Sequence, residues 1–133
     1  MTSEIFTIGE LCAEFGVTPR TLRFYEYKEL LAPIREGQRR LFTCRDRARL
    51  KLILRGRRFG FSLDEMKDLL DLYDVDSTQI TQLSAILEAS RRHHAELVAR
   101  RDALDEAIAD MEAQMREGEA MLQERLSAAA QAA

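Results

Sequence analysis

The chain of 133 residues is 46% hydrophobic and 32% charged, and its net charge of −3 is unevenly divided: residues 1–60 carry 13 basic and 7 acidic side chains, and residues 61–133 carry 7 and 16. No apolar run approaches the about 20 residues of a membrane span, and two cysteines are too few to indicate a disulfide framework or a thiolate metal cluster. Without a signal-peptide pattern, the chain is expected to be cytoplasmic.

The first expected helix covers residues 8–15. Thr7 and Glu10 have the spacing of a capping box, and apolar residues recur through the helix at inward-facing positions. Gly16 is expected to end the helix, because glycine adopts the left-handed conformation needed there at no steric cost. Another helix start follows within two residues, which is typical of the turn in a helix-turn-helix.

The second expected helix, residues 19–29, is the candidate recognition helix. Thr18 is placed to cap it, and Pro19 occupies its first position, where a missing backbone N–H is tolerated. Arginine can bond a guanine edge or clamp a phosphate, and a tyrosine hydroxyl can bond phosphate. We therefore predict that this helix contacts DNA through Thr18, Arg20, Arg23 and Tyr25.

A second basic cluster follows in residues 33–42, where two short extended arms flank a turn at Gly37. A short basic helix followed by a basic hairpin is the pattern of a winged helix-turn-helix. In this wing we predict DNA contacts from Arg35, Arg39 and Arg40. Arg20 is the candidate for reading bases, and Tyr25 and Arg40 are the candidates for binding phosphate. The alternative is that these are ordinary surface residues, with Tyr25 partly in the core.

Two more capped helices are expected after the wing. Thr43 with Asp46 begins the third, and Ser62 with Glu65 begins the fourth, after a break at Gly60. The third helix is dense in arginine on its surface. The corner between the two helices resembles a second helix-turn-helix.

Residues 75–78 are expected to be a polar linker, and residues 79–126 one long helix, because this stretch is rich in alanine, leucine, glutamate and arginine. Its apolar residues recur in alternating steps of four and three, with Ile86 and Val98 beside them, which is typical of a coiled coil. Such a seam needs a partner helix, most simply from an identical chain. Residues 127–133 are expected to fray. The predicted dimerisation residues are Leu83, Leu87, His94, Leu97, Leu104, Ile108, Met111 and Met115.

Five motifs together resemble the MerR family of transcriptional regulators. They stand in family order and at family spacing at residues 6–11, 19–26, 30–35, 40–42 and 59–63. The resemblance implies a mainly α fold, in which residues 1–74 form a winged helix-turn-helix with a short β wing. The long helix that follows is implied to pair with its copy as an antiparallel coiled coil.

The same resemblance implies a function. A homodimer would bind double-stranded DNA at a pseudo-palindromic promoter site, distort the promoter spacer and change its use by RNA polymerase, in association with the nucleoid. In the family, the corner between the third and fourth helices lies against the DNA backbone, so Arg55 and Arg57 are expected phosphate contacts. Phe42 stands where relatives often have tyrosine, so we expect it to pack. No catalytic motif, and therefore no enzymatic activity or cofactor, is indicated.

The cysteines and histidines bear on what the effector is. Metal-sensing relatives place thiolates at both ends of the long helix, where this chain has none, so Cys12 and Cys44 are interpreted as structural and no metal site is predicted. His93 and His94 could form a pH switch or a weak metal site, but His94 fits better as a polar seam residue that fixes register.

Residues 50–74 also resemble a subgroup of short regulators, without a separate effector domain, linked to the breakdown of branched-chain amino acids and fatty acids. This resemblance implies a small organic effector such as an acyl-CoA, or no effector, rather than a metal. The competing hypothesis is a coiled-coil module whose head binds another protein. That hypothesis leaves the wing arginines without a role.

Overall fold

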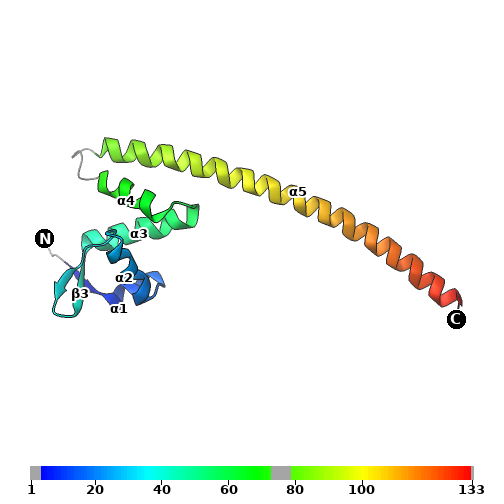
Figure 1. Cartoon of the computed structure of the whole chain (residues 1–133), viewed down its shortest axis with the longest axis horizontal. Coiled ribbons are helices and arrows are strands. Elements are labelled where there is room, and N and C mark those ends of the chain that lie inside the picture. The colour runs from blue at the N-terminus through cyan, green and yellow to red at the C-terminus, as the bar shows by residue number, and fades with distance from the viewer. Residues whose placement is uncertain (1–3, 73–78, 133) are drawn as a thin grey trace. The chain divides into compact units, whose positions relative to one another are not determined.

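The computed structural model describes residues 4–72 and 79–132, and most of these residues are helical (Figure 1). The structure confirms the predicted mainly α fold with a short β wing and a long C-terminal helix. The chain separates into two compact units, Met1–His93 and His94–Ala133. The expected linker at residues 75–78 lies outside the described residues. The elements are β1 (Ile5–Thr7), α1 (Ile8–Phe15), α2 (Pro19–Tyr27), β2 (Ile34–Glu36), β3 (Arg39–Thr43), α3 (Cys44–Phe59), α4 (Leu63–Asp71) and α5 (Ile80–Ala132).

Short-range hydrogen bonds define the first helix. The Thr7 hydroxyl accepts from the backbone N–H of Glu10 at 3.1 Å, and Glu10 Oε1 accepts from the N–H of Thr7 at 2.9 Å. These two bonds are the predicted capping box, and they satisfy donors that have no partner within the helix. Gly16 adopts a φ of 67°, the left-handed conformation expected at the end of α1.

The third and fourth helices also begin where expected, but their caps differ. The hydroxyls of Thr43 and Ser62 each accept from the N–H three residues later. In α3 the reciprocal bond is present, because Asp46 Oδ2 accepts from the N–H of Thr43 at 3.0 Å. In α4 the Glu65 carboxylate lies instead 2.7 Å from His93 Nε2 of α5. A tertiary contact therefore replaces the second half of the predicted capping box.

The three strands form one antiparallel sheet in the order β1-β3-β2. β1 pairs Phe6 with Phe42, and within the wing β2 pairs Arg35 with Arg40. Gly37 has a φ of 63° in the connecting turn, a conformation that glycine adopts without steric penalty. The predicted wing is confirmed. Phe42 is fully buried, as expected for a packing residue.

The core of the unit Met1–His93 brings together α1 to α4, β3 and the first turns of α5. On α5, Ala89 is buried and Ile86 packs against the core. Ile86, which we expected beside the coiled-coil seam, thus also contacts the core of its own unit, on the side of α5 that carries the buried Gln82 and Ala89. The largest fully buried side chains are Leu11, Leu22, Leu30, Phe42, Leu50 and Ile53.

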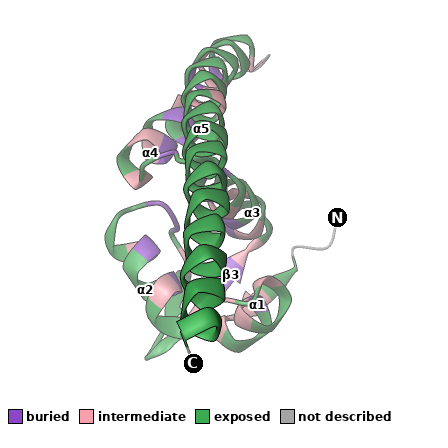
Figure 2. Ribbon diagram, turned by 90° about the vertical axis from the view of Figure 1, so that its right-hand side faces the viewer, coloured by how far each residue is buried: buried purple, intermediate pink, exposed green. Residues whose placement is uncertain are grey.

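The long helix α5 has 53 residues, which corresponds to about 80 Å along its axis. Residues 99–132 are all exposed, and Figure 2 shows them in green. The helix continues to Ala132, six residues beyond the end at residue 126 that we expected for it. Four of these six residues are alanine, which has the highest helix propensity. Among the described residues, no helix is apolar over enough of its length to cross a lipid bilayer.

Candidate nucleic-acid interface

The recognition helix α2 presents an exposed basic and aromatic stripe. Arg20, Arg23 and Tyr27 are spaced by three and four residues, so they lie on one side of the helix. All three are exposed, and the Tyr27 side chain reaches 80% exposure. Beside them the Phe24 ring is 45% exposed, with the Lys28 ammonium 5.8 Å from its centroid. Tyr27, Phe24 and Lys28 were not among the predicted contacts, although their spacing from Arg20 could have indicated them.

Tyr25 occupies a different environment from the one expected for a DNA contact. Its side chain is 7% exposed and belongs to the core of the unit. Burial raises the pKa of the Tyr25 hydroxyl, and the positive charge of Arg57 partly opposes this effect. The alternative that we gave for Tyr25, a core residue, therefore describes the position of its ring.

Thr18 serves the structure of α2 directly. Its hydroxyl accepts from the N–H of Thr21 at 3.2 Å and lies 3.0 Å from the Thr21 hydroxyl. The predicted N-cap is confirmed, and Thr18 remains exposed at the start of the helix. Backbone N–H groups at such a helix start favour anions, so this end of α2 suits a phosphate group.

The wing is joined to α2 through Glu26. Arg40 Nε donates to Glu26 Oε2 at 2.6 Å, and Arg35 Nη1 donates to Glu26 Oε1 at 3.2 Å. Burial alone would raise the pKa of Glu26, but the hydrogen bonds and charges of Arg40 and Arg35 outweigh it and lower the pKa below its ordinary value. Glu26 is therefore charged near neutral pH, and Arg40, predicted as a phosphate ligand, is already engaged within the protein.

Three of the arginines predicted on α2 and in the wing remain without such engagement. The side chains of Arg20, Arg23 and Arg39 are exposed and form no ion pair or hydrogen bond with the other residues that the structure describes. Two stand on α2 and one on β3 of the wing. Their guanidinium groups retain all five donors for an outside acceptor such as phosphate or guanine.

The two arginines predicted at the corner between α3 and α4 have separate positions. Arg57 Nη1 donates to the carbonyl of Phe61 at 3.0 Å and so holds the corner closed. Arg55 lines a cavity of about 190 Å³ between α3, α4 and α5, whose other lining residues are mostly apolar. Both side chains stay exposed, so both could also meet the DNA backbone.

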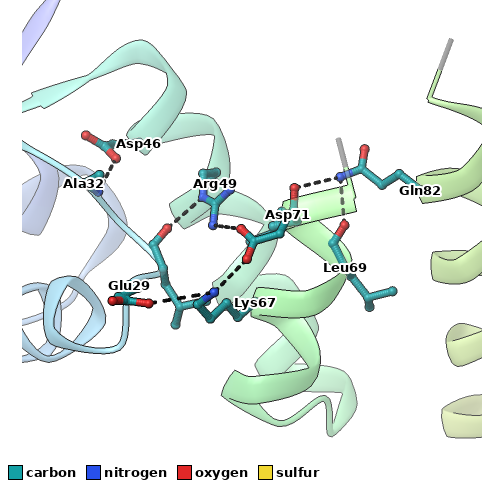
Figure 3. A network of polar contacts seen from close by, with 10 residues as sticks. Glu29, Ala32, Asp46, Arg49, Lys67, Leu69, Asp71 and Gln82 are labelled. Carbon is teal, nitrogen blue, oxygen red and sulfur yellow. Dashed lines mark hydrogen bonds and ion pairs between the residues drawn. The ribbon is translucent and has the colours of Figure 1, made fainter. Parts of the chain in front are cut away.

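A network of polar contacts holds the segment that follows α2. Arg49 Nε donates to the carbonyl of Leu30 at 2.7 Å, and Arg49 Nη2 lies 3.3 Å from Asp71 Oδ1 at the end of α4 (Figure 3). Gln82 Nε2 of α5 donates to the carbonyl of Leu69 at 3.0 Å. Asp46 Oδ1 accepts from the N–H of Ala32 at 2.9 Å. The network connects the segment that follows α2 with α3, α4 and the start of α5, and sequence reasoning did not foresee it because its partners are distant along the chain.

The predicted dimerisation residues all lie on the surface. The seven apolar members have side chains between 40% and 65% exposed, and His94 is exposed too. Leaving so many large apolar groups in water is unfavourable by about 25 cal/mol for each Å² of apolar area. These residues are Leu83, Leu87, Leu97, Leu104, Ile108, Met111 and Met115.

Of the two cysteines, only Cys12 has the partly buried position expected of a structural thiol. Cys12 is half-buried on α1, and burial raises the pKa of its thiol against the opposing charge of Arg23. Cys44 is exposed at the start of α3, with its thiol 3.7 Å from the carbonyl of Glu4. Within the described ranges, no three His, Cys, Asp or Glu side chains gather in a group that could hold a metal ion.

Comparison with known proteins gives consistent matches. The model of the MerR HTH family regulatory protein matches residues 6–72, and a second model, MerR, DNA binding, matches residues 47–114. The HTH-type transcriptional regulator ZntR of Escherichia coli is 41% identical over 70 residues, which are 51% of this chain and 50% of ZntR. The chain thus spans about half the length of this curated relative.

Two further matches cover more of the chain. The HTH-type transcriptional regulator PA4778 of Pseudomonas aeruginosa is 33% identical over 107 residues, which are 76% of this chain and 81% of PA4778. The crystal structure of a MerR-family transcriptional regulator from Bacillus cereus superposes with a TM-score of 0.67 at 26% identity. The match covers 82% of this chain and 78% of the chain from Bacillus cereus.

Proposed function

Because the chain belongs to the MerR family of DNA-binding transcriptional regulators, we propose that it binds a pseudo-palindromic promoter site as a homodimer and distorts the spacer within that promoter. The observation that carries the proposal is the exposed apolar seam of α5, with side chains 40% to 65% exposed from Leu83 to Met115. A seam of this kind requires a partner, and pairing two identical chains would supply two recognition helices for two half-sites. Members of the family are regulators and not enzymes, as the sequence predicted.

The exposed arginines of α2 and the wing would make the contacts. Arg20 would read a base, and Arg23 and Arg39 would bind base or phosphate, since each keeps its donors available. Thr18, Arg35, Arg55 and Arg57 would add contacts to the DNA backbone. Arg40 would contribute mainly through its pairing with Glu26, and Tyr25 through packing.

Regulation would follow from the shape of the bound promoter. Two heads held by one coiled coil would bend or untwist the spacer, which would change how RNA polymerase uses the promoter. In this proposal the head, residues 1–74, reads the site, and residues 79–126 set the separation of two copies.

The effector of this regulator would be a small organic molecule, or there would be none, rather than a metal ion. The support is the mostly apolar cavity of about 190 Å³, whose lining residues include Arg55, which suits a small apolar molecule bearing an anionic group. Such chemistry is compatible with the subgroup linked to branched-chain amino acid and fatty acid breakdown. A thermal-shift panel of acyl-CoAs, free carboxylic acids and divalent metals tests this: stabilisation by a metal alone would overturn it.

Footprinting tests the regulator directly. DNA fragments are first selected from genomic DNA with the purified chain, and the recovered sites are then footprinted. The proposal predicts a protected pseudo-palindrome with enhanced cleavage in its centre, where the spacer is distorted. Failure to select any specific site, together with a stable complex with another protein, would favour the competing function of a coiled-coil interaction module.

A further inference from the structure

One carboxylate on the recognition helix is shared by both strands of the wing. Glu26 lies in the last turn of α2, while Arg35 and Arg40 are directly opposite each other on β2 and β3. Glu26 Oε2 accepts from Arg40 Nε at 2.6 Å, and Glu26 Oε1 accepts from Arg35 Nη1 at 3.2 Å. Arg35 Nη1 also lies 3.5 Å from Oε2, so the one carboxylate is bonded to both strands of the wing.

We propose that Glu26 is a positioning residue for DNA recognition, which fixes the wing against the recognition helix so that both reach the same stretch of duplex. The inference rests on the proposed function, since it assumes that α2 and the wing contact one site together. A link to a single strand would leave the hairpin free to twist about that link. Links to both strands, made at a matched pair in the register, restrain its tilt and its twist.

The side chains of Glu26, Arg35 and Arg40 differ in their exposure to solvent. The side chains of Arg40 and Glu26 are 21% and 22% exposed, whereas that of Arg35 is 49% exposed. Arg40 is held at the shorter distance through Nε, so its two terminal nitrogen atoms are oriented by Glu26. A guanidinium group has five N–H donors, and the pairing with Glu26 uses one from Arg40. Glu26 therefore orients an arginine that can still donate to phosphate.

If Glu26 acted only through its charge, its effect on DNA binding would be opposite to that of a positioning residue. A carboxylate beside a DNA-binding surface repels phosphate, so removing its charge should raise the affinity for every DNA sequence. Positioning predicts instead that removing it lowers the affinity for the specific site, because the wing is no longer held in place. The two explanations differ in sign, which makes them separable in one titration.

The wing supplies a matched control in Glu36. It lies on β2 next to Arg35 and is exposed, and its carboxylate has no hydrogen bond or ion pair with the other residues of the described chain. The change Glu36→Gln removes the same charge from the same hairpin, with no link to α2 to break. The variants Glu26→Gln and Glu36→Gln therefore differ in geometry and not in net charge.

The experiment measures the affinity of the full chain for its selected site and for a scrambled duplex of equal length, over a range of salt concentrations. We expect Glu26→Gln to weaken specific binding about tenfold while scrambled binding stays equal or strengthens, and Glu36→Gln to strengthen both slightly. In an Arg40→Gln background, Glu26→Gln should have a smaller effect, because only the longer link to Arg35 then remains to be broken. Equal melting temperatures of the variants would show that the loss is not unfolding.

The outcomes separate this role from the proposed function. If the unaltered chain binds its site selectively and Glu26→Gln strengthens specific binding as Glu36→Gln does, Glu26 is an ordinary surface carboxylate and the positioning role is overturned. If the unaltered chain shows no selectivity between the site and the scrambled duplex, the proposed function fails and the role of Glu26 fails with it. Should Glu26→Gln not fold, Arg40→Lys keeps the charge and must still lower the ratio of specific to scrambled binding.

Discussion

The imidazole ring of His93 on α5 stacks on the ring of Phe61, which precedes α4, with 4.2 Å between their centroids. His93 Nε2 also lies 2.7 Å from Glu65 Oε1, and Arg92 pairs with the same carboxylate. These contacts join the first turns of α5 to the corner that follows α3. The first turns of α5 are thereby attached to the rest of the unit Met1–His93.

The Glu65 contact predicts acid sensitivity. Burial raises the pKa of Glu65, but the hydrogen bond from His93 and the charges of His93 and Arg92 outweigh it, so the pKa lies below its ordinary value of 4.5. The folded state then binds fewer protons than the unfolded state, so the contribution of Glu65 is fully present above about pH 4.5 and is lost as pH falls further. Urea unfolding at a series of pH values from neutral to acid should show this decline.

The matched variant for this measurement is Glu65→Gln. It should be less stable than the unaltered chain near neutral pH and should lose less stability on acidification. Glu26 and Asp71 also have lowered pKa values, each through ion pairs that outweigh burial, so part of the decline persists in the variant. A variant with the full pH dependence of the unaltered chain would contradict the role of Glu65.

Two neighbouring tyrosines on α2 should respond differently to truncation. Tyr25 is 7% exposed and Tyr27 is 80% exposed. Tyr25→Ala should lower the free energy of unfolding by about 3 kcal/mol, through lost burial and the cavity left behind. Tyr27→Ala should change it by less than about 0.5 kcal/mol, as expected for an exposed position. Denaturant unfolding of both variants measures this, and equal losses would contradict the assignment of Tyr25 to the core.

Two glycines in helices offer a comparable contrast. Gly56 on α3 is buried, and a methyl group added there would overlap the sulfur of Met66. Gly56→Ala should therefore destabilise the protein by about 1–3 kcal/mol through overpacking. At Gly118 on α5 an added methyl group would meet nothing within 4 Å, so Gly118→Ala should stabilise the helix by up to about 1 kcal/mol. Thermal unfolding of the two variants checks the sign, and Met66→Ala should partly restore Gly56→Ala.

The exposed arginines should divide by the kind of contact that they make. Arg20→Ala should weaken binding to the selected site by about 1–3 kcal/mol and relax its sequence preference at one base pair. If Arg39 contacts phosphate, Arg39→Ala should instead weaken binding to all sequences. It should also reduce by about 0.9 the slope of log affinity against log salt concentration. Arg116→Ala, an exposed arginine on α5, is the control and should change neither quantity. Preserved sequence preference in Arg20→Ala would refute base reading by this residue.

Local chemistry made much of the fold predictable. Capping residues such as Thr7 and Thr43, the left-handed glycine Gly16 and the turn at Gly37 act over three or four residues, so their effect can be seen in the sequence. The winged arrangement followed from these signals together with the resemblance of five motifs to one family. The same reasoning selected Arg20, Arg23 and Arg39 as candidate DNA contacts. Their side chains are exposed in the structure.

The parts that sequence reasoning missed depend on contacts between distant residues. Glu26 is separated from Arg40 by a loop and a strand, so helix spacing gives no sign of their pairing. Glu65 fits a capping box by spacing, but His93 from α5 takes its carboxylate. Ile86 fits the apolar period beside the seam, yet a period alone cannot decide which partner covers it.

The proposed mode of DNA binding depends most on the pairing of two chains through α5, and one measurement tests this pairing directly. Light scattering of the purified chain bound to a duplex with one selected site gives the number of chains per duplex, since each chain has a mass of 15.3 kDa. The account predicts two chains for the unaltered protein, and at most one, bound weakly, when Leu104 and Ile108 are both changed to aspartate. A single chain on the whole pseudo-palindrome, or an unchanged complex with the double variant, would contradict it.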